Sequence, residues 1–348
     1  MIKKILLITL IALTIILAGC SGNNATVGPS FNPFIGGTDA LKFEFVPGLP
    51  PTQEGAILDN GKSQFSVGLK VTNAGEFDLE PNQLRLDLRG ILPEQFGINW
   101  ADTTDVLIDP LNGAKKGLDG SILDGQFTTM SFEGLSYLPD ARGDIPKTFR
   151  VDACYFYKTS STTPICVAND VTGSLVDTNN DPVCEINSPK TTKTSSGPVQ
   201  ITNFKQMPQG SNKVSIMFDI VHQGQGHIYT STANPGPSGP SNCDTSQLNP
   251  DRNHVWVSVY LPDQSAPTIN LKCMGAFTNP SSATESNPVE GDVVLYEGQP
   301  RTITCSIEET TTGQDVLYED LLNIDLYYNY GDSFDQTVVI KDMGSANN

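Results

Sequence analysis

The sequence is poor in basic residues and in histidine. It has 21 lysines and arginines against 39 aspartates and glutamates, a formal net charge of -18, and only three histidines. Such an acidic surface repels a phosphate backbone, and no basic cluster offsets it, so nucleic acid is not expected as a partner. With so few imidazoles, the chain also offers few candidates for a general base.

The motifs of common catalytic and cofactor sites are missing as well. The chain has no GxSxG elbow, no dinucleotide fingerprint and no phosphate-binding glycine loop. No acid pair for glycoside hydrolysis can be selected among the 39 carboxylates from sequence alone. We therefore predict no catalytic residue, no cofactor and no metal, and we expect the protein not to be an enzyme.

One segment pairs two of the three histidines. His222 and His227 flank a glycine-rich turn, HQGQGH, and two imidazoles in this setting can clamp a transition metal. A third ligand would have to be His254 or a carboxylate such as Asp219, and nothing in the spacing requires it. A turn with two surface histidines is the favoured interpretation.

A second segment resembles the start of a calcium loop. Oxygen side chains stand at 177, 179 and 181, but Pro182 and Ser188 occupy the positions where an EF-hand needs Gly and Glu. A full EF-hand site is excluded, and a looser calcium site in this acidic segment stays open.

Only one long apolar run is present, and it lies at the N-terminus. Lys3 and Lys4 precede the run from Ile5 to Leu17, which is short for a spanning helix and typical of a secretory signal. The segment ends in Leu-Ala-Gly-Cys, which resembles the lipobox of lipoproteins. This predicts cleavage after residue 19 and a lipid on Cys20, so that an exported protein is held on the outer face of the cell membrane. An ordinary signal peptide or an uncleaved anchor is the alternative.

The remainder is dominated by period-two alternation. FSVGLKVTN places Phe65, Val67, Leu69 and Val71 on one face, and glycine and proline punctuate the chain throughout. We predict an all-β fold of two tandem immunoglobulin-like antiparallel β-sandwich domains. The predicted division is 1–19 signal peptide, 20–33 flexible tether, 34–186 first sandwich, 187–198 linker, 199–343 second sandwich and 344–348 tail.

The two blocks resemble each other in sequence. Residues 65–76 align with 215–226, 127–133 with 302–308, and 149–157 with 322–330, in the same order along the chain. We interpret this as tandem duplication of one sandwich. The last pair aligns Tyr155 and Tyr157 with Tyr328 and Tyr330, which we expect to pack at one end of each core, with a recognition surface for glycan or protein as the alternative.

The motif V-x-L-x-V-x-N-x-G-E, with Asn73, Gly75 and Glu76 at its end, resembles the adhesion-type immunoglobulin-like modules often called CARDB. The second block has His222 and Gly224 at the positions of this Asn and Gly. The resemblance implies stacked modules on a prokaryotic cell surface. The whole chain also resembles exported lipoproteins of small-genome archaea, which implies a surface location and no particular activity.

Seven cysteines are present and no CxxC pair, which favours disulfides over a thiolate metal site. With Cys20 assigned to lipid, an even number remains, and this predicts three disulfides in an exported chain. The six are Cys154, Cys166, Cys184, Cys243, Cys273 and Cys305.

The cysteines divide three and three between the blocks. Cys273 and Cys305 share faces with buried aliphatic residues, so we favour a Cys273–Cys305 bond. Cys154 and Cys166 would face each other across a hairpin that turns near Ser160, and Cys166 with Cys184 is the competing choice. Complete pairing then joins Cys243 to one cysteine of the first block.

These features predict a non-catalytic, lipid-anchored surface protein with an adhesive, envelope-structural or partner-binding role. Its partners are the membrane, through the lipid, and a surface protein or glycan, and the sequence leaves its oligomeric state open. A solute- or polysaccharide-binding lipoprotein is the first alternative. An extracellular hydrolase is the second.

Overall fold

The computed structural model describes most of the chain after residue 31. The described residues are 32–53, 56–168, 184–187, 189–210, 213–230, 240, 243, 249–262, 269–310 and 317–344. The predicted signal peptide, Cys20, nearly all of the predicted tether and the calcium candidate at 177–181 lie outside them. Within these ranges, no helix is both long enough and apolar enough to cross a membrane.

Strands form where apolar and polar residues alternate. In the first half, the elements are β1 (Leu41–Phe45), β2 (Ile57–Leu58), β3 (Phe65–Asn73), β4 (Leu84–Arg89), η1 (Pro93–Phe96), η2 (Trp100–Thr103), β5 (Thr104–Val106), β6 (Lys115–Lys116), β7 (Ile122–Leu123), β8 (Phe127–Leu135) and β9 (Ile145–Ala168). In the second half they are β10 (Lys193–Thr194), β11 (Val199–Pro208), β12 (Lys213–His222), β13 (His227–Tyr229), β14 (His254–Tyr260), β15 (Ile269–Cys273), β16 (Phe277–Thr278), β17 (Val289–Val294), η3 (Tyr296–Gly298), β18 (Arg301–Glu309) and β19 (Leu317–Lys341).

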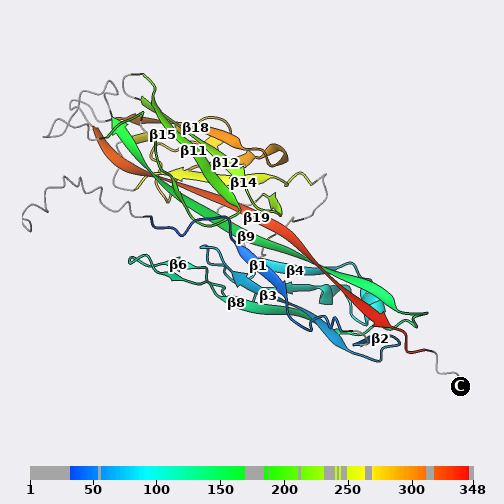
Figure 1. The fold of residues 1–348 in the computed structure, drawn as a ribbon. Coiled ribbons are helices and arrows are strands. Elements are labelled where there is room, and N and C mark those ends of the chain that lie inside the picture. The colour runs from blue at the N-terminus through cyan, green and yellow to red at the C-terminus, as the bar shows by residue number, and fades with distance from the viewer. Residues whose placement is uncertain are drawn as a thin grey trace, which may run out of the picture. The chain divides into compact units, whose positions relative to one another are not determined.

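The strands form three main sheets, and the predicted all-β antiparallel sandwich fold is confirmed. The central sheet runs β16-β17-β14-β19-β9-β4-β5, with β2, β10 and β13 attached beside it. The sheet β1-β3-β8 covers one half of it and β11-β12-β18-β15 the other (Figure 1). The order of pairing repeats, because β5-β4-β9 and β1-β3-β8 in the first half correspond to β17-β14-β19 and β11-β12-β18 in the second.

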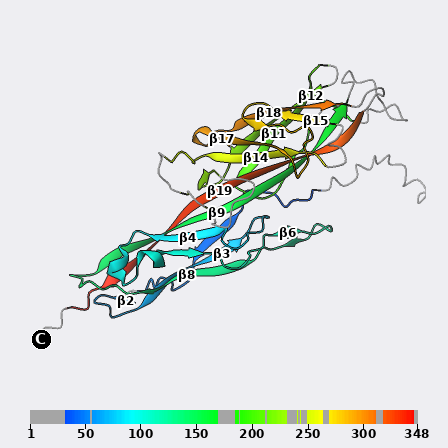
Figure 2. The same cartoon turned by 180° about the vertical axis from the view of Figure 1, so that it is seen from behind.

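Two long strands connect the halves. β9 and β19 pair antiparallel from Ile145↔Ile340 to Ala168↔Leu317, over the whole of β9 (Figures 1 and 2). The first part of β9 pairs with β4, and its last part lies beside the stretch of β19 that pairs with β14. Each strand therefore lies partly in one sandwich and partly in the other, and residues 34–348 form one compact unit with one continuous hydrophobic core.

The three disulfides settle the alternatives left by the sequence. Cys273 is bonded to Cys305, the favoured pair, and the two residues lie opposite each other on β15 and β18. Cys166 is bonded to Cys184 and Cys154 to Cys243. The predicted hairpin near Ser160 is wrong, because β9 continues through it and separates Cys154 from Cys166 by 12 residues of one strand, about 40 Å. The disulfide that joins the two sequence blocks is therefore formed by Cys154 of the first block and Cys243 of the second.

The four aligned tyrosines meet where the two halves join, not at separate ends of two cores. Tyr157 lies opposite Tyr328 and Tyr155 opposite Tyr330 on the paired long strands, and all four are buried. Neighbouring rings in this group are 5.6–6.4 Å apart between centroids. This seam between the sandwiches is therefore aromatic and tightly packed.

The predicted linker and the first described residues are held at the same seam. Glu76 accepts hydrogen bonds from the backbone N–H groups of Ile35 (2.8 Å), Gly36 (3.0 Å) and Ser196 (2.6 Å). The Gln200 side chain donates to the carbonyl of Gly37 at 3.0 Å. The chain therefore enters the folded unit beside its seam.

Candidate functional site: a charged groove on the central sheet

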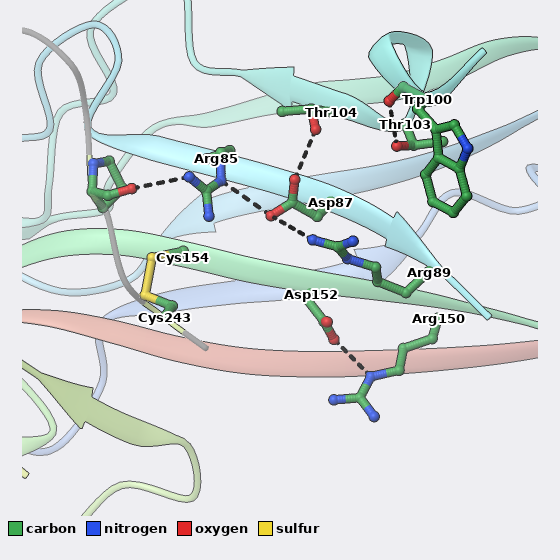
Figure 3. Close-up of polar contacts among 11 residues, drawn as sticks. Arg85, Asp87, Arg89, Trp100, Thr103, Thr104, Arg150, Asp152, Cys154 and Cys243 are labelled. Carbon is green, nitrogen blue, oxygen red and sulfur yellow. Dashed lines mark hydrogen bonds and ion pairs between the residues drawn. A yellow bond between two sulfur atoms is a disulfide. The ribbon is translucent and has the colours of Figure 1, made fainter. Parts of the chain in front are cut away.

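The outer face of the central sheet carries alternating charges. In β4 the leucines point into the core, so Arg85, Asp87 and Arg89 stand on the other face. In β9 the same alternation places Arg150 and Asp152 outward, between the buried residues Phe149, Val151 and Ala153. The sequence R-x-D-x-R thus lies beside R-x-D on a neighbouring strand (Figure 3).

The register brings like charges face to face. Arg89 lies directly opposite Arg150, and Asp87 directly opposite Asp152. Like charges opposite each other on neighbouring strands destabilise a sheet. The arrangement is therefore costly for the fold, and this is the kind of local conflict that functional sites tolerate.

The conflict is relieved by ion pairs along each strand. Arg85 Nε lies 3.0 Å and Arg89 Nη2 3.8 Å from Asp87 Oδ2, and Arg150 Nε lies 2.6 Å from Asp152 Oδ1 (Figure 3). The hydrogen bond to Asp152 raises the pKa of Arg150 above its ordinary value. Each guanidinium carries five N–H donors, and the ion pairs of Arg89 and Arg150 involve only one nitrogen of each group.

The charges line a groove of about 760 Å³. Its other wall is the turn of Gln225 and Gly226 with His227, together with Asp332 and Ser333 of β19. The Cys154–Cys243 bond also lines the groove, beside Gly331, where a Cβ would lie 2.9 Å from the Tyr229 ring and 3.3 Å from the Cys243 Cβ. Among the described lining residues, no phenylalanine, tyrosine or tryptophan is found, and the groove is strongly polar. The exposed Trp100 belongs to η2, which contacts β4.

Arginine also lies behind the groove. Arg252 Nη2 is 3.0 Å from His227 Nδ1. Burial, and then the nearby guanidinium, lower the pKa of His227, which favours the neutral imidazole at pH 7. Burial raises the pKa of Asp332. Four of the six arginines of this acidic chain thus gather at one site, namely Arg85, Arg89, Arg150 and Arg252.

The structure does not bring the metal candidates of the sequence together. His222 Nε2 lies 3.3 Å from the Tyr330 hydroxyl, and His227 faces Arg252, a cation. Among the described residues, no group of three or more His, Cys, Asp or Glu side chains is placed to hold a metal ion. The four tyrosines, which the sequence predicted to pack in the cores with a recognition surface as the alternative, are buried.

The sequence contained a signal for the groove. R-x-D-x-R at 85–89 and R-x-D at 150–152 are the same alternation on two strands, and they are unusual in a chain with so few arginines. Strand register was the missing information, because a shift of two residues would have paired opposite charges.

Comparisons with known proteins give little further guidance. No protein-family model and no curated protein matches the chain. Among solved structures, it is similar to the partial N-terminal region of an enterococcal surface protein, with 7% identity over 82% of this chain and 88% of that one and a TM-score of 0.19. It is also similar to the VP2 subviral particle of infectious bursal disease virus, with 9% identity over 81% and 82% and a TM-score of 0.14. Scores this low do not establish a shared fold, so the architecture rests on the strand pairing described above.

Proposed function

We propose that this is a non-catalytic, lipid-anchored protein of the outer cell surface that binds an acidic glycan through the charged groove. Three disulfides fit an oxidising compartment outside the cytoplasm. The lipid on Cys20 attaches it to the membrane. The CARDB-type resemblance and the two sandwiches joined through two shared long strands are in keeping with an adhesive or envelope role.

The observation that carries the binding proposal is the opposed pair of Arg89 and Arg150. Each guanidinium is paired with one carboxylate of its own strand, and an anion between the two would further reduce the repulsion between them. Planar guanidinium groups bind carboxylate and sulfate in bidentate geometry. The pair therefore lowers the stability of the free protein, and it raises the affinity for an anionic ligand that binds between the two groups.

The other groups of the groove favour a sugar as the carrier of the anion. Asp87, Asp152, Asp332 and Gln225 present oxygen acceptors suited to sugar hydroxyl groups. A lining without aromatic rings or large apolar side chains gives no reason for an apolar ligand to enter. A uronic acid carries both a carboxylate and hydroxyls, and the volume is sufficient for a short oligosaccharide.

The test is calorimetric titration of residues 34–348 with trigalacturonic acid, with maltotriose as the neutral control. We expect binding of the acid trimer to weaken roughly tenfold or more in Arg89→Gln and in Arg150→Gln, since each removes a charge-assisted bidentate contact. Arg142→Gln, on the exposed loop before β9, is the matched control and should bind like the unmodified protein. Equal affinity for both sugars, or no effect of either groove variant, would contradict the proposal.

The same protein and sugars distinguish the proposed function from a solute-binding lipoprotein and from a hydrolase. A monomeric uronate that binds as tightly as the trimer would favour a solute-binding lipoprotein. New reducing ends released from the trimer would favour a hydrolase. In the proposed function, affinity grows with chain length and the oligosaccharide is recovered intact.

A further inference from the structure

The hairpin β6-β7 is unusually apolar for an exposed element. It pairs Lys115 with Leu123 and Lys116 with Ile122, and forms a two-stranded sheet of its own. Leu118 is 92% exposed, Leu123 71% and Ile122 57%. Both views show the hairpin projecting beyond the sheet β1-β3-β8 (Figures 1 and 2). Leu118 lies in the turn, and Ile122 and Leu123 are successive residues of β7, so the exposed apolar side chains occupy the tip and both faces of the hairpin. Exposed apolar surface on a projecting element marks an interaction site.

The base of the hairpin is firmly held, so its exposure is not a sign of poor packing. Ala114 N donates to Gly75 O at 2.7 Å, and Gln126 N to Asn112 O at 2.9 Å. Lys115 Nζ lies 2.7 Å from an oxygen of Asp78. A Cβ on Gly125 would overlap the carbonyl oxygen of Asn73, so the return strand is seated against β3. The fold presents these apolar side chains to the outside on a rigid base.

The hairpin lies where the N-terminal segment joins the folded unit. Lys116 Nζ donates to the carbonyl oxygen of Phe34 at 3.0 Å. Phe34 comes 14 residues after Cys20, a distance that even a fully extended chain limits to about 50 Å. A lipid on Cys20 would therefore keep Phe34, and the hairpin that contacts it, within about 50 Å of the bilayer, a distance from which the hairpin can reach the surface.

The chemistry of the hairpin matches that surface. Leucine and isoleucine side chains partition into the boundary between headgroups and acyl chains, where interfacial elements insert by about 5–10 Å. The ammonium groups of Lys115 and Lys116 are held at the base by Asp78 and the Phe34 carbonyl, so the apolar side chains carry the attachment. The turn residue Asp119 accepts hydrogen bonds from Ser121, which lower its pKa. Its charge limits insertion to this shallow depth.

We propose that the hairpin of residues 115–123 is a second membrane attachment, which inserts Leu118, Ile122 and Leu123 into the lipid interface. One acyl signal alone gives weak, reversible attachment, and a second signal makes it stable. The orientation of the protein, but not the affinity of the hairpin for lipid, rests on the proposed lipid at Cys20. With both attachments, the groove is carried at a fixed height above the membrane.

The experiment uses residues 34–348, which form a compact unit and lack Cys20. Vesicles of three parts phosphatidylcholine and one part phosphatidylglycerol are the probe. We expect the indole fluorescence of Leu118→Trp to shift to the blue and to be quenched by brominated lipid. Met274→Trp, at a position 72% exposed in the second half, should show neither change.

A second pair of variants tests the contribution to binding. The fraction of the double variant Leu118→Ser, Leu123→Ser that sediments with vesicles should be about tenfold lower than that of the unmodified protein. The fraction of Met274→Ser should equal that of the unmodified protein. Unchanged fluorescence of Leu118→Trp on addition of vesicles would overturn the proposal. A blue shift that occurs without vesicles and grows with protein concentration would also overturn it, because it would show that a second copy of the protein covers the hairpin. Acylation of Cys20 is read separately, by release of Cys20→Ala into the medium, so the two failures are distinguishable.

Discussion

At the scale of single residues, the two halves use different side chains at the ends of equivalent strands. Asn73 is the last residue of β3 and donates to the carbonyls of Phe77 (2.7 Å) and Leu111 (2.9 Å), which closes its own turn. His222 occupies the matching place as the last residue of β12 and contacts the Tyr330 hydroxyl. Burial, reinforced by His227, lowers the pKa of His222 to about 4.

This difference predicts a pH dependence of stability. An unfolded histidine titrates near pH 6.5, so between about pH 6.5 and 4 the unfolded state binds more protons than the folded state. The free energy of unfolding should therefore fall as the pH is lowered through this window. We expect His222→Asn to lose about 1 kcal/mol less than the unmodified protein between pH 7 and pH 4.5, after allowance for partial exposure.

Urea unfolding at the two pH values measures this effect. The variant copies the residue that the first half already uses. Equal losses in His222→Asn and the unmodified protein would rule out His222 as the cause.

At the scale of elements, the turns after β3 and β12 are seated on tyrosines of the long strands. A Cβ on Gly75 would overlap the Tyr157 hydroxyl, and one on Gly224 the Tyr330 hydroxyl. The glycines of the repeated motif are thus required by close approach to a ring, and neither has a positive φ. The same turn-to-tyrosine contact in both halves accords with a duplicated sandwich.

We expect Gly75→Ala and Gly224→Ala each to lower the free energy of unfolding by about 2–3 kcal/mol through overpacking. Adding Tyr157→Phe to Gly75→Ala should restore part of that loss. Restoration stays partial because the carbonyl oxygen of Asp39 is also only 2.8 Å from the new Cβ.

Chemical denaturation measures the free energy of unfolding of all three variants. Gly68→Ala is the control, because the nearest atoms to its Cβ would be the Leu49 side chain at 3.2 Å and the Met130 carbonyl oxygen at 3.7 Å, and none of them belongs to a tyrosine. An equal loss in the control would contradict the role of the tyrosines.

At the scale of the whole molecule, β9 and β19 make the two sandwiches interdependent. If one half unfolds, β9 and β19 lose their pairing there, and the same two strands carry the pairing of the other half. The buried tyrosines lie on both strands. The predicted linker also packs at the seam, where its Ser195 and Ser196 are buried.

This connection predicts one cooperative unfolding transition for residues 34–348. Scanning calorimetry should give equal calorimetric and van't Hoff enthalpies, since no half has a complete core of its own. A fragment of residues 34–186 should not fold by itself, because half of β9 would expose its buried face. Two resolved transitions, or a folded fragment, would show instead that each block is an independent domain.

Much of this architecture follows from the sequence. Alternation in segments such as Phe65–Asn73 identifies strands, because a period of two buries every second side chain whatever the strand pairs with. The shared faces of Cys273 and Cys305 identify their bond for the same reason. The order of strands in the two halves is likewise visible as repeated segments.

Long-range register is what only the tertiary structure decided. A strand of 24 residues reads like two shorter strands with a turn at Ser160, because local sequence does not say how far a partner continues. Pairing of β9 with β19 and β4 brought the tyrosines to one seam and set Arg89 against Arg150. The sequence determined which side chains face outward, and the register of distant strands determined which of them meet, since pairing depends on contacts between residues far apart in the chain.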